Sequence, residues 1–384
     1  MSSPSRLPEQ AVHPGIGGPD CVGIASGAAV RPILRGRADW GKGGRDLSIA
    51  NVPRDRGLML LVTGGAGFIG SNVVANLNDR GRTDIAVSDR LETGSKWRNL
   101  QKRQLADVVA PADLERWLAG RKLDAIIHLG AISDTTATDG DLVLATNFGL
   151  SLRLLDWCTA SRTPFIYASS AATYGDGAAG FSDDCSLAAL KRLRPMNLYG
   201  FSKHLFDLAV VDRFSKGHKL PPQWAGLKFF NVFGPNEYHK GAMMSVLAKV
   251  FDEAKRGCPV QLFKSYRDGV ADGEQRRDFI YVKDAVAVVD WLIDTPAVCG
   301  IYNVGTGNAR SFRDMILIMF EALGRPAKID YVEMPPAIQA SYQYFTQAPV
   351  ENLRRAGYPG QFAPLEHSVR DYVTNYLDAA DRYR

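Results

Sequence analysis

A tyrosine and a lysine four positions apart are the residues whose spacing points most directly to chemistry. They are Tyr199 and Lys203 in Tyr-Gly-Phe-Ser-Lys. On a helix, residues four apart share one face, so both side chains can point at one hydroxyl group of a substrate. An ammonium beside a phenol favours the phenolate, so we expect Lys203 to lower the pKa of Tyr199 and make it a base. Such a base takes the proton of an alcohol while its carbon loses a hydride.

A serine at the end of a predicted strand is the expected companion of this pair. Residues 169–175 (Ser-Ser-Ala-Ala-Thr-Tyr-Gly) follow an apolar run at 164–168. Ser170 would then hydrogen-bond the same substrate hydroxyl as Tyr199. Because a chain with fourteen tyrosines shows the Tyr-x-x-x-Lys spacing by chance, the pair gains its weight from this serine and from a glycine motif upstream.

That glycine motif is residues 63–70 (Thr-Gly-Gly-Ala-Gly-Phe-Ile-Gly), which follow one apolar run and open a helical pattern. Gly64, Gly67 and Gly70 permit a tight turn, close approach of backbone to a pyrophosphate, and packing of helix on strand. The helix N-terminus offers N–H groups to the phosphates. Asp89, at the end of the next predicted strand, is placed for the adenosine ribose hydroxyls. The pattern predicts a dinucleotide site.

The residues around Asp89 leave the choice between NAD and NADP open. Asp89 alone favours NAD, whereas the cations Arg90, Lys96 and Arg98 suit the 2′-phosphate of NADP. The alternative, in which these cations are solvated loop charges, has equal weight. Further on, the small residues of Leu-Gly-Ala at 129–131 would let the chain pass close to the nicotinamide half.

Alternating strand and helix patterns must position these motifs. Apolar runs at 58–63, 85–88, 123–129, 164–168 and 227–230 are predicted strands, and residues 68–80 and 150–158 have helical spacing. This rhythm predicts an α/β fold, a doubly wound parallel sheet. After Asn231 the pattern becomes irregular, which indicates a smaller C-terminal substrate-binding domain. We therefore expect a dinucleotide-binding domain at 58–230 plus about 278–303, and a substrate-binding domain at 231–277 plus 304–384.

The first 57 residues differ from the rest of the chain. They contain ten Gly and six Pro without sustained periodicity, so we expect a disordered N-terminal extension. The alternative is that the protein begins at Met59, which opens the first strand. Eight Lys/Arg against five Asp/Glu place +3 of the net charge of +5 here. Because the remainder is nearly neutral, nucleic acid is not an expected partner.

Several other classes are not expected either. The five cysteines and six histidines show neither a CxxC pair nor metal-ligand spacing, so we predict no metal site and a reduced, cytosolic protein. No apolar run approaches the roughly 20 residues of a membrane span. No signal-peptide pattern opens the chain.

Glycine triplet, strand-end serine and Tyr/Lys pair occur in one order over residues 59 to about 378. This constellation resembles the extended short-chain dehydrogenase/reductase family, whose members mostly act on nucleotide sugars. The resemblance implies a Rossmann sheet with Ser170, Tyr199 and Lys203 as the catalytic residues. It also implies that Lys203 contacts the nicotinamide ribose.

Five stretches resemble one branch of that family, the epimerases that invert C6″ of an ADP-linked heptose for lipopolysaccharide core synthesis. They are residues 167–175, 230–235, 239–241, 277–279 and 342–348. The likeness implies NADP as the cofactor, with NAD as the alternative, and an ADP-sugar substrate. It also implies a cytoplasmic homo-oligomer, often a pentamer.

Lys240 is a candidate second acid/base for a chemical reason. Epimerisation by oxidation and re-reduction returns hydride to the opposite face of the carbonyl, so the alcohol proton is handled from two orientations. One tyrosine serves one orientation, and a desolvated lysine whose pKa is lowered serves the other. The alternatives are a phosphate-contacting or merely exposed lysine, and His239 is a weaker rival for the role.

The resemblance supplies the remaining site residues. It implies cofactor contacts from Gly64, Gly67, Phe68, Ile69, Gly70, Asp89, Arg90, Lys96, Leu129, Gly130, Ala131, Asn147, Lys203, Val232 and Lys240. It implies substrate contacts from Ser170, Asn231, Ala242, Lys249, Phe263, Arg277 and Tyr342. Arg277 suits a diphosphate because its guanidinium forms a bidentate fork; the alternative is a surface salt bridge.

This chain departs from the family pattern at several places. Lys249 stands where many relatives carry a histidine, Ala242 replaces a serine, and Pro111 falls where relatives carry a cofactor lysine. Residues 267–275 form an Asp/Gly-rich insertion, and residues 176–194 are longer than expected. These departures weaken the substrate and NADP predictions more than the reaction type.

Two rival functions remain. One is another nucleotide-sugar epimerase or reductase, such as a UDP-hexose 4-epimerase. A dehydratase is disfavoured because those enzymes resemble Thr-Asp-Glu where this chain has Ser-Ala-Ala at 170–172. The other is a non-catalytic NAD(P)-sensing regulator, although such proteins commonly lose the Tyr/Lys pair that this chain keeps.

Overall fold

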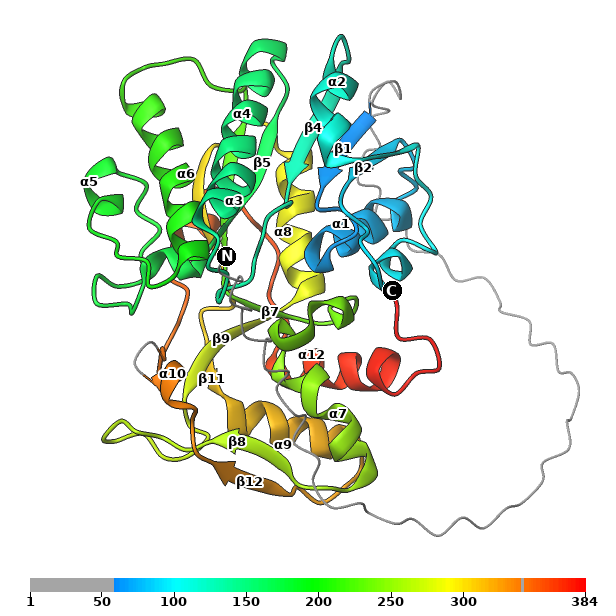
Figure 1. The fold of residues 1–384 in the computed structure, drawn as a ribbon, viewed down its shortest axis with the longest axis vertical. Coiled ribbons are helices and arrows are strands. Elements are labelled where there is room, and N and C mark those ends of the chain that lie inside the picture. The colour runs from blue at the N-terminus through cyan, green and yellow to red at the C-terminus, as the bar shows by residue number, and fades with distance from the viewer. Residues whose placement is uncertain (1–58, 340–341) are drawn as a thin grey trace, which may run out of the picture. The chain divides into compact units, whose positions relative to one another are not determined.

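Seven parallel strands form the central sheet in the order β10-β6-β5-β4-β1-β2-β3 (Figure 1). They are β1 (Met59–Thr63), β2 (Ile85–Ser88), β3 (Asp107–Val109), β4 (Leu123–His128), β5 (Phe165–Ser170), β6 (Trp224–Phe229) and β10 (Gly300–Val304). The structure is a computed structural model that describes residues 59–339 and 342–384. The predicted disordered extension, residues 1–57, lies outside the described residues.

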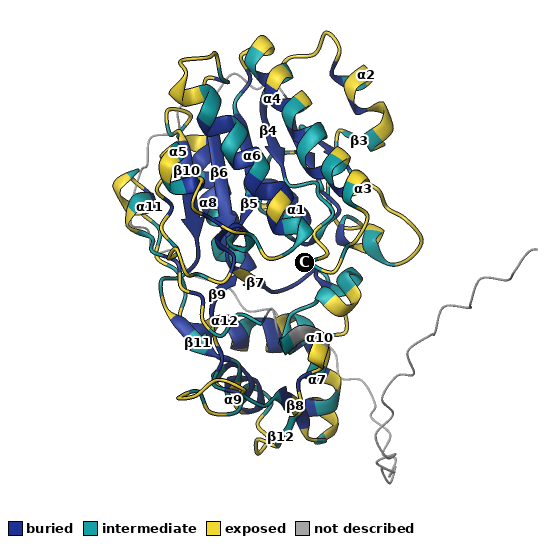
Figure 2. Cartoon of the chain, turned by 60° about the vertical axis from the view of Figure 1, so that its left-hand side comes forward, coloured by how far each residue is buried: buried dark blue, intermediate teal, exposed yellow. Residues whose placement is uncertain are grey.

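Helices cover both faces of this sheet because side chains alternate between its two sides. Leu60 and Val62 of β1 belong to one hydrophobic cluster with α1 (Phe68–Asp79) and α8 (Val282–Asp294). Leu61, between them, belongs to a second cluster with α4 (Leu150–Ser161) and α6 (Leu198–Ser215). The strands are accordingly buried while the outer helix faces are exposed (Figure 2). The predicted doubly wound parallel sheet is confirmed.

The strand order reverses between β1 and β4, and this reversal sets the place of the site. Val62 of β1 pairs with Val87 of β2 on one side and with Ile127 of β4 on the other. The connection after β1 therefore crosses one face of the sheet and the connection after β4 the other. In open α/β sheets such a reversal leaves a crevice at the carboxyl ends of the strands, where ligands bind.

A smaller part of the chain lies beyond these carboxyl ends (Figure 1). A three-stranded sheet has the order β11-β9-β7, and β8 pairs with β12. These strands are β7 (Asn231–Phe233), β8 (Val260–Phe263), β9 (Arg276–Tyr281), β11 (Ala309–Ser311) and β12 (Ile329–Val332), packed with α7 (Val246–Arg256), α9 (Phe312–Ala322) and α12 (Leu365–Tyr372).

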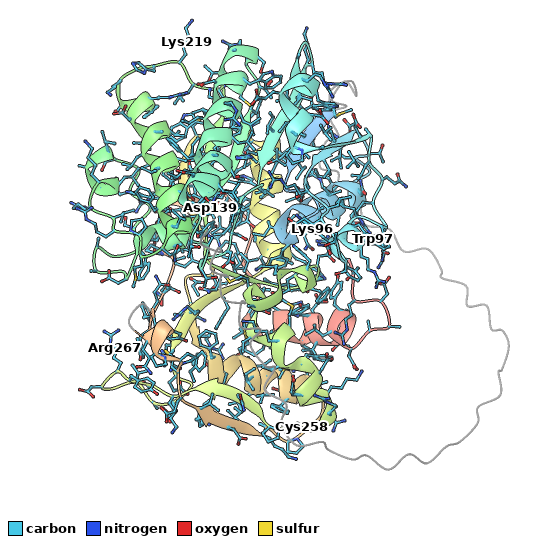
Figure 3. The ribbon with its side chains drawn as sticks, in the orientation of Figure 1. Lys96, Trp97, Asp139, Lys219, Cys258 and Arg267 are labelled. Carbon is cyan, nitrogen blue, oxygen red and sulfur yellow. The ribbon has the colours of Figure 1, made fainter. Side chains whose placement is uncertain are left out.

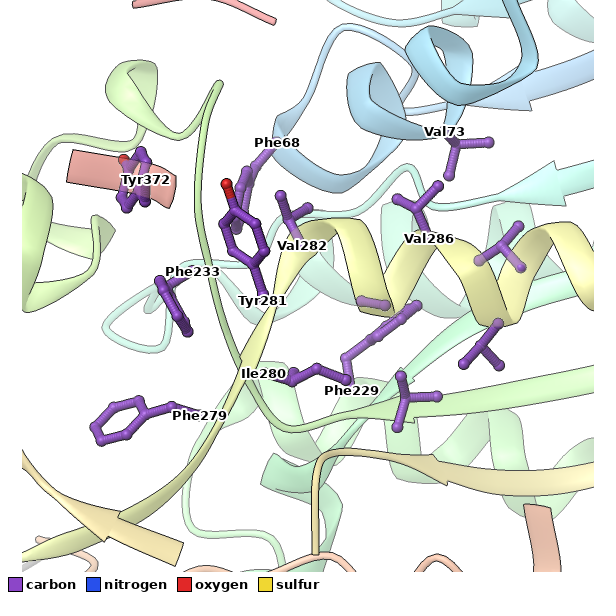
Figure 4. Packing of buried hydrophobic residues seen from close by; sticks show 14 of the residues in the cluster. Phe68, Val73, Phe229, Phe233, Phe279, Ile280, Tyr281, Val282, Val286 and Tyr372 are labelled. Atoms are coloured by element: carbon purple, nitrogen blue, oxygen red, sulfur yellow. The ribbon is translucent and has the colours of Figure 1, made fainter. Parts of the chain in front are cut away.

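Strand β9 joins this smaller part to the main sheet. Its last residue, Tyr281, is followed at once by Val282, the first residue of α8, and α8 packs on α1. Tyr281 stacks near Phe233 with ring centroids 5.4 Å apart, and Figure 4 shows both beside Phe68 and Val282. The hydrophobic core thus continues from one part into the other. The described residues lie within one compact unit, and the division into two domains stays a prediction.

Shorter elements complete the chain. They are helices α2 (Leu114–Leu118), α3 (Gly140–Leu144), α5 (Leu187–Leu190), α10 (Pro336–Gln339) and α11 (Glu351–Arg355), the 3₁₀ turns η1 (Lys96–Asn99), η2 (Pro111–Asp113), η4 (Ala171–Tyr174) and η5 (Tyr238–Met243), and the π-helical turns η3 (Ala145–Gly149) and η6 (Val373–Leu377). Within the described ranges, no helix has the length and apolar character needed to span a membrane.

The predicted bounds need several corrections. The strand predicted at 227–230 runs instead from Trp224 to Phe229, and all six of its residues, Lys228 included, are buried. The strand predicted at 164–168 runs on to Ser170, and the helix predicted at 150–158 to Ser161. Strands β3 and β10 were not predicted. β3 has three residues, too few for a period-two pattern to be visible.

Candidate active site

The turn after β1 leaves no room for side chains at two of its glycines. Gly64 has φ +68°, and a Cβ added there would lie 2.6 Å from the backbone nitrogen of Gly130. A Cβ on Gly70 would lie 2.1 Å from the carbonyl oxygen of Gly64. Both contacts are with backbone, which cannot move aside. The glycines therefore let α1 pack against the turn and bring the ends of β1 and β4 together.

The N-terminus of α1 fits the diphosphate of a dinucleotide. Gly67 is its N-cap residue and no side chain caps the helix, so its first-turn N–H groups lack intrahelical acceptors. Phe68, Ile69 and Gly70 form that turn. Their N–H groups and the positive end of the helix dipole favour an anion here.

Asp89 lies beside this turn, where an adenosine ribose is expected. Its Oδ2 accepts a hydrogen bond of 2.9 Å from the Ala66 N–H, and its Oδ1 accepts one of 2.7 Å from Lys96 Nζ. Lys96 also donates to the Arg90 carbonyl oxygen, and Figure 3 shows it next to Trp97. A carboxylate and an ammonium thus stand together at the position predicted for the ribose hydroxyls and a 2′-phosphate.

A chain of hydrogen bonds joins the carboxyl ends of β1 and β4 to α4. Ser151 Oγ donates to the Asn147 carbonyl oxygen, so it accepts from His128 Nε2–H at 2.8 Å. His128 Nδ1 then accepts from the Thr63 hydroxyl at 2.6 Å. Burial lowers the pKa of His128 to about 3, with Lys203 adding to the effect. The imidazole is therefore neutral and links β1, β4 and α4.

Asn147 connects this chain of hydrogen bonds to the loop after β4 and to α6. Its side chain donates to the Ile132 carbonyl oxygen and accepts from the Ile132 N–H at 2.8 Å. It also donates to Ser202 Oγ at 3.0 Å. Asn147 lies in the π-helical turn η3, and such turns are frequent at functional sites. Leu129, Gly130 and Ala131 are thereby fixed next to α6.

The predicted catalytic side chains are brought together. Ser170 ends β5, Tyr199 opens α6, and a hydrogen bond joins the Tyr199 hydroxyl to the Ser170 side chain. Lys203 follows one turn later and is buried. Asn197, the N-cap residue of α6, accepts a hydrogen bond from the Gly200 N–H, which starts the helix at this point.

One electrostatic prediction is wrong. Burial raises the pKa of Tyr199, the hydrogen bond to Ser170 lowers it in part, and Asp207 raises it. Lys203, whose ammonium donates to the Ala168 carbonyl oxygen at 2.8 Å, does not supply the predicted lowering. Burial lowers the pKa of Lys203 itself to about 8, against which Asp207 acts.

Lys240 lies on the other wall of the crevice. It belongs to η5, and its Nζ lies 5.1 Å from the centre of the Phe68 ring, in a cation–π contact. Burial lowers the pKa of Lys240; Glu237 raises it and Lys249 lowers it further. Lys249, at the start of α7, is exposed, as is Ala242. Lys240 is therefore close to the cofactor loop.

Arg277 lies in a third group of predicted residues, on β9. Its guanidinium carbon is 5.1 Å from the Tyr342 ring centre and 5.6 Å from the Phe312 ring centre. Phe263 meets Tyr342 edge-on. Burial lowers the pKa of Arg277. Among the described residues its guanidinium donates one hydrogen bond, to the neighbouring Arg276 carbonyl oxygen, so the alternative of a surface salt bridge is not what holds it.

Two more predicted residues lie on β7, between these walls. Asn231 is exposed, and its Oδ1 accepts a long hydrogen bond of 3.4 Å from Thr346 Oγ1. Val232, the next residue, is half-buried. Since successive residues of a strand point to opposite faces, these two side chains face different walls.

Five polar residues that support the site were not predicted. Buried Asn99 donates to the carbonyl oxygens of Ala66 and Asn236, and buried Asp278 accepts from the backbone of Thr306, Gly307 and Ala348. The others are Asp207, Lys228 and Glu237, each 0% exposed. A charged residue within an apolar run, such as Lys228 in Trp224–Phe229, was the available signal.

Comparison with known proteins agrees with this geometry. Residues 60–305 match the model of the NAD dependent epimerase/dehydratase family. The chain belongs to this family. It is thus an enzyme of nicotinamide dinucleotide chemistry, and the matched range contains Gly64, Tyr199 and Lys203.

Two similar proteins carry the same name. The ADP-L-glycero-D-manno-heptose-6-epimerase of Fusobacterium nucleatum is 44% identical over 335 residues, which are 85% of this chain and 100% of that protein. The enzyme of the same name from Nitratidesulfovibrio vulgaris is 46% identical over 329 residues, again 85% and 100%.

Two solved structures share the fold. The Helicobacter pylori ADP-L-glycero-D-manno-heptose-6-epimerase superposes with a TM-score of 0.69 at 30% identity, covering 83% of this chain and 96% of that one. The Thermus thermophilus UDP-glucose 4-epimerase in complex with NAD has a TM-score of 0.66 at 26% identity, covering 84% and 100%.

The buried state of Lys203 predicts a pH-dependent stability. The unfolded chain keeps the Lys203 proton up to its ordinary pKa of 10.5, whereas the folded protein loses it near 8. Between these values the unfolded state binds more protons, so stability rises with pH. In Lys203→Met this rise disappears. From about pH 7.5 to 9.5 we expect the wild type to gain about 2 kcal/mol relative to the variant in urea unfolding.

The matched control for this measurement is Lys219→Met. Lys219 is exposed on the loop after α6, and Figure 3 shows it at the top of the view, away from Lys96. It should leave the pH dependence of the unfolding free energy as in the wild type. Parallel curves for wild type and Lys203→Met would show that Lys203 is charged in the folded protein throughout this range.

Proposed function

We propose that this chain is an NADP-dependent ADP-glyceromanno-heptose 6-epimerase that inverts C6″ of ADP-D-glycero-D-manno-heptose by oxidation and re-reduction. The observation that carries the proposal is the Tyr199 hydroxyl, hydrogen-bonded to Ser170 with Lys203 one helical turn away. The likeness to relatives named for this activity, over their whole length, supports the substrate.

In the first half of the reaction, Tyr199 takes the proton of the C6″ hydroxyl while C6″ loses its hydride. Ser170 orients that hydroxyl from the end of β5. A bound nicotinamide ring supplies the acceptor and later the donor of the hydride. Lys203, one helical turn further along α6, is the proposed contact of the nicotinamide ribose. The product of this half-reaction is a ketone at C6″.

In the second half, hydride returns to the other face of that ketone. The new alkoxide then points away from Tyr199 and needs a proton donor on the opposite wall. We propose Lys240 for this step, since burial and Lys249 lower its pKa and a general acid works best when its pKa is near the working pH. Its contact with Phe68 keeps it beside the cofactor loop.

Arg277 is the proposed ligand of the substrate diphosphate. It is a buried cation between Phe312 and Tyr342, and its planar fork suits two phosphate oxygens. Phe263, Tyr342 and Asn231 line the same region and are proposed substrate contacts, together with Ala242 and Lys249 at the edge of η5 and α7.

NADP is proposed because Lys96 and Arg90 stand beside Asp89. Lys96 offsets the Asp89 carboxylate, which would otherwise repel a 2′-phosphate, and NAD remains the alternative. Only the family resemblance supports a homo-oligomer, a pentamer, acting in the cytoplasm. The division into dinucleotide-binding and substrate-binding domains is proposed from the change of the sequence pattern after Asn231.

The substrate assignment is tested by NMR with ADP-D-glycero-D-manno-heptose and UDP-galactose as alternative substrates. We expect only the ADP-heptose to be converted to its C6″ epimer. Tyr199→Phe should lower kcat by about 10² to 10⁴-fold, as loss of a general base does, while cofactor stays bound. Turnover of UDP-galactose alone would indicate another epimerase, and turnover of neither sugar would indicate a non-catalytic sensor.

The role of Lys240 is tested by Lys240→Met. We expect epimerisation to fall by about 10²-fold or more, while added substrate still reduces the bound cofactor, seen by its absorbance. This split follows because Tyr199 alone performs the first half-reaction. Lys255→Met, an exposed change on α7, is the control. Wild-type turnover by Lys240→Met would remove Lys240 from the mechanism.

The cofactor preference is tested by Lys96→Ala. A charge-assisted hydrogen bond to a 2′-phosphate contributes about 1.5 to 3 kcal/mol, so NADPH should bind about ten- to a hundredfold more weakly. NADH binding, measured alongside by nicotinamide fluorescence, should change little. Lys102→Ala, whose ammonium pairs with Asp381, is the matched control. Equal weakening for both cofactors would contradict the proposal.

A further inference from the structure

A buried ion pair lies directly beneath the catalytic residues. Lys228 Nζ of β6 donates to Asp207 Oδ2 of α6 at 2.7 Å, and both side chains are 0% exposed. Removing two charges from water is costly unless their other polar atoms are also satisfied. Here Asp207 also accepts from Tyr167 and Ser169. The Asp207 carboxylate thus has hydrogen-bond donors besides Lys228.

The lysine end of the pair reaches the strand-end serine. Lys228 Nζ donates to Thr173 Oγ1 at 2.6 Å and lies 4.9 Å from the Tyr174 ring centre. Thr173 Oγ1 in turn donates to the Ser170 carbonyl oxygen at 2.8 Å. Ser169, whose hydroxyl binds Asp207, directly precedes Ser170. The backbone that presents Ser170 is therefore held from below at two points.

The aspartate end shares a helix face with the catalytic pair. Tyr199, Lys203 and Asp207 are spaced four residues apart on α6, so they lie on one face in successive turns. Asp207 acts electrostatically on both Tyr199 and Lys203. The hydrogen bonds made by Tyr199 and Lys203 are to other partners, Ser170 and the Ala168 carbonyl oxygen.

Other titratable groups surround this face. On α6 itself they are Tyr199, Lys203 and His204, and from the elements packed against it they are His128 of β4, Tyr167 of β5, Tyr174 of η4, Lys228 of β6 and, in the segment before α6, Asp183, Cys185 and Arg194. Lys228 is the group in this list that forms a salt bridge with Asp207.

We propose that Asp207 and Lys228 are positioning residues whose paired opposite charges lie beneath Tyr199 and Lys203, and together set the pH at which Tyr199 and Lys203 exchange protons. This inference rests on the proposed role of Tyr199 as a general base. In this proposal neither Asp207 nor Lys228 contacts the substrate. Their charges act through Tyr199, and their hydrogen bonds act through the Ser170 backbone.

The two charges are expected to shift the pKa of Tyr199 in opposite directions. Asp207→Asn leaves the Lys228 ammonium uncompensated, and a nearby positive charge favours the Tyr199 phenolate. Lys228→Met leaves the Asp207 carboxylate, which opposes the phenolate. The double variant removes both charges and restores the balance. A role limited to packing would weaken the fold in each single variant but would shift phenolate formation in neither.

The experiment is a pH titration of Tyr199 in the cofactor-bound protein. Each variant is compared by ultraviolet difference absorbance with the same variant carrying Tyr199→Phe, so that only the Tyr199 phenolate contributes. We expect the midpoint to fall by about one pH unit in Asp207→Asn and to rise by about one in Lys228→Met. The double variant should return to within a few tenths of the wild type.

The pH dependence of kcat should move in the same directions. Asp212→Asn, which removes a carboxylate paired with Lys216 on the exposed face of the same helix, should leave both midpoints unchanged. Thermal unfolding shows which variants are folded, and the double variant tests the balance if a single one is not. Unmoved midpoints, or shifts of one sign in both single variants, overturn the proposal.

The titration needs no substrate, so it separates this inference from the proposed function. If the protein converts no nucleotide sugar but the midpoints move in opposite directions, the charge balance holds and the substrate assignment fails. If it converts ADP-heptose but the midpoints do not move, the assignment holds and the role of the ion pair fails.

Discussion

The close approach of two strand ends is the constraint on which the rest of the site depends. Gly64 and Gly130 leave no space for a side chain between the ends of β1 and β4, and the Thr63–His128 hydrogen bond fastens the two strands at the same level. From this contact α1 leads to one side of the crevice. The loop after β4 leads to the other, where Asn147 ties it to α6. Cofactor loop and catalytic helix are therefore placed by one piece of backbone packing.

Buried carboxylates organise the second half of the site in a similar way. Glu237 accepts hydrogen bonds from Ser245 and Tyr372, which joins η5 to α7 and α12. Asp278 gathers the loop at 306–307 and the segment at 346–348 around β9. The hydrogen bonds of Glu237 and Asp278 support the elements that carry the exposed residues facing the crevice. These buried carboxylates thus support the residues that are proposed to contact ligands, where a fixed geometry matters most.

The sequence indicated the fold and the motif residues because each has a local signature. The Gly64–Gly70 spacing, the strand-end Ser170 and the Tyr199/Lys203 interval are all visible along the chain. Lys228 was missed because a single charged residue inside an apolar strand resembles an interruption, and its partner Asp207 comes from another element. The pKa of Tyr199 was misjudged because spacing shows that Lys203 shares its face but not that the Tyr199 hydroxyl loses contact with water, and this burial is the largest cause of the raised pKa.

The unbroken passage from β9 to α8 has a mechanical consequence. Arg277 stands on β9, and α8 is clamped to α1 through Asp290, which bonds to Asn76 and Arg80. The proposed anchor of the substrate diphosphate on β9 is thus joined without a loop to α8, which packs against α1, the helix proposed to face the cofactor diphosphate. The spacing between the proposed substrate-phosphate site and the cofactor loop is therefore set by this backbone segment, and a sugar nucleotide proposed as substrate would have to match that spacing in length.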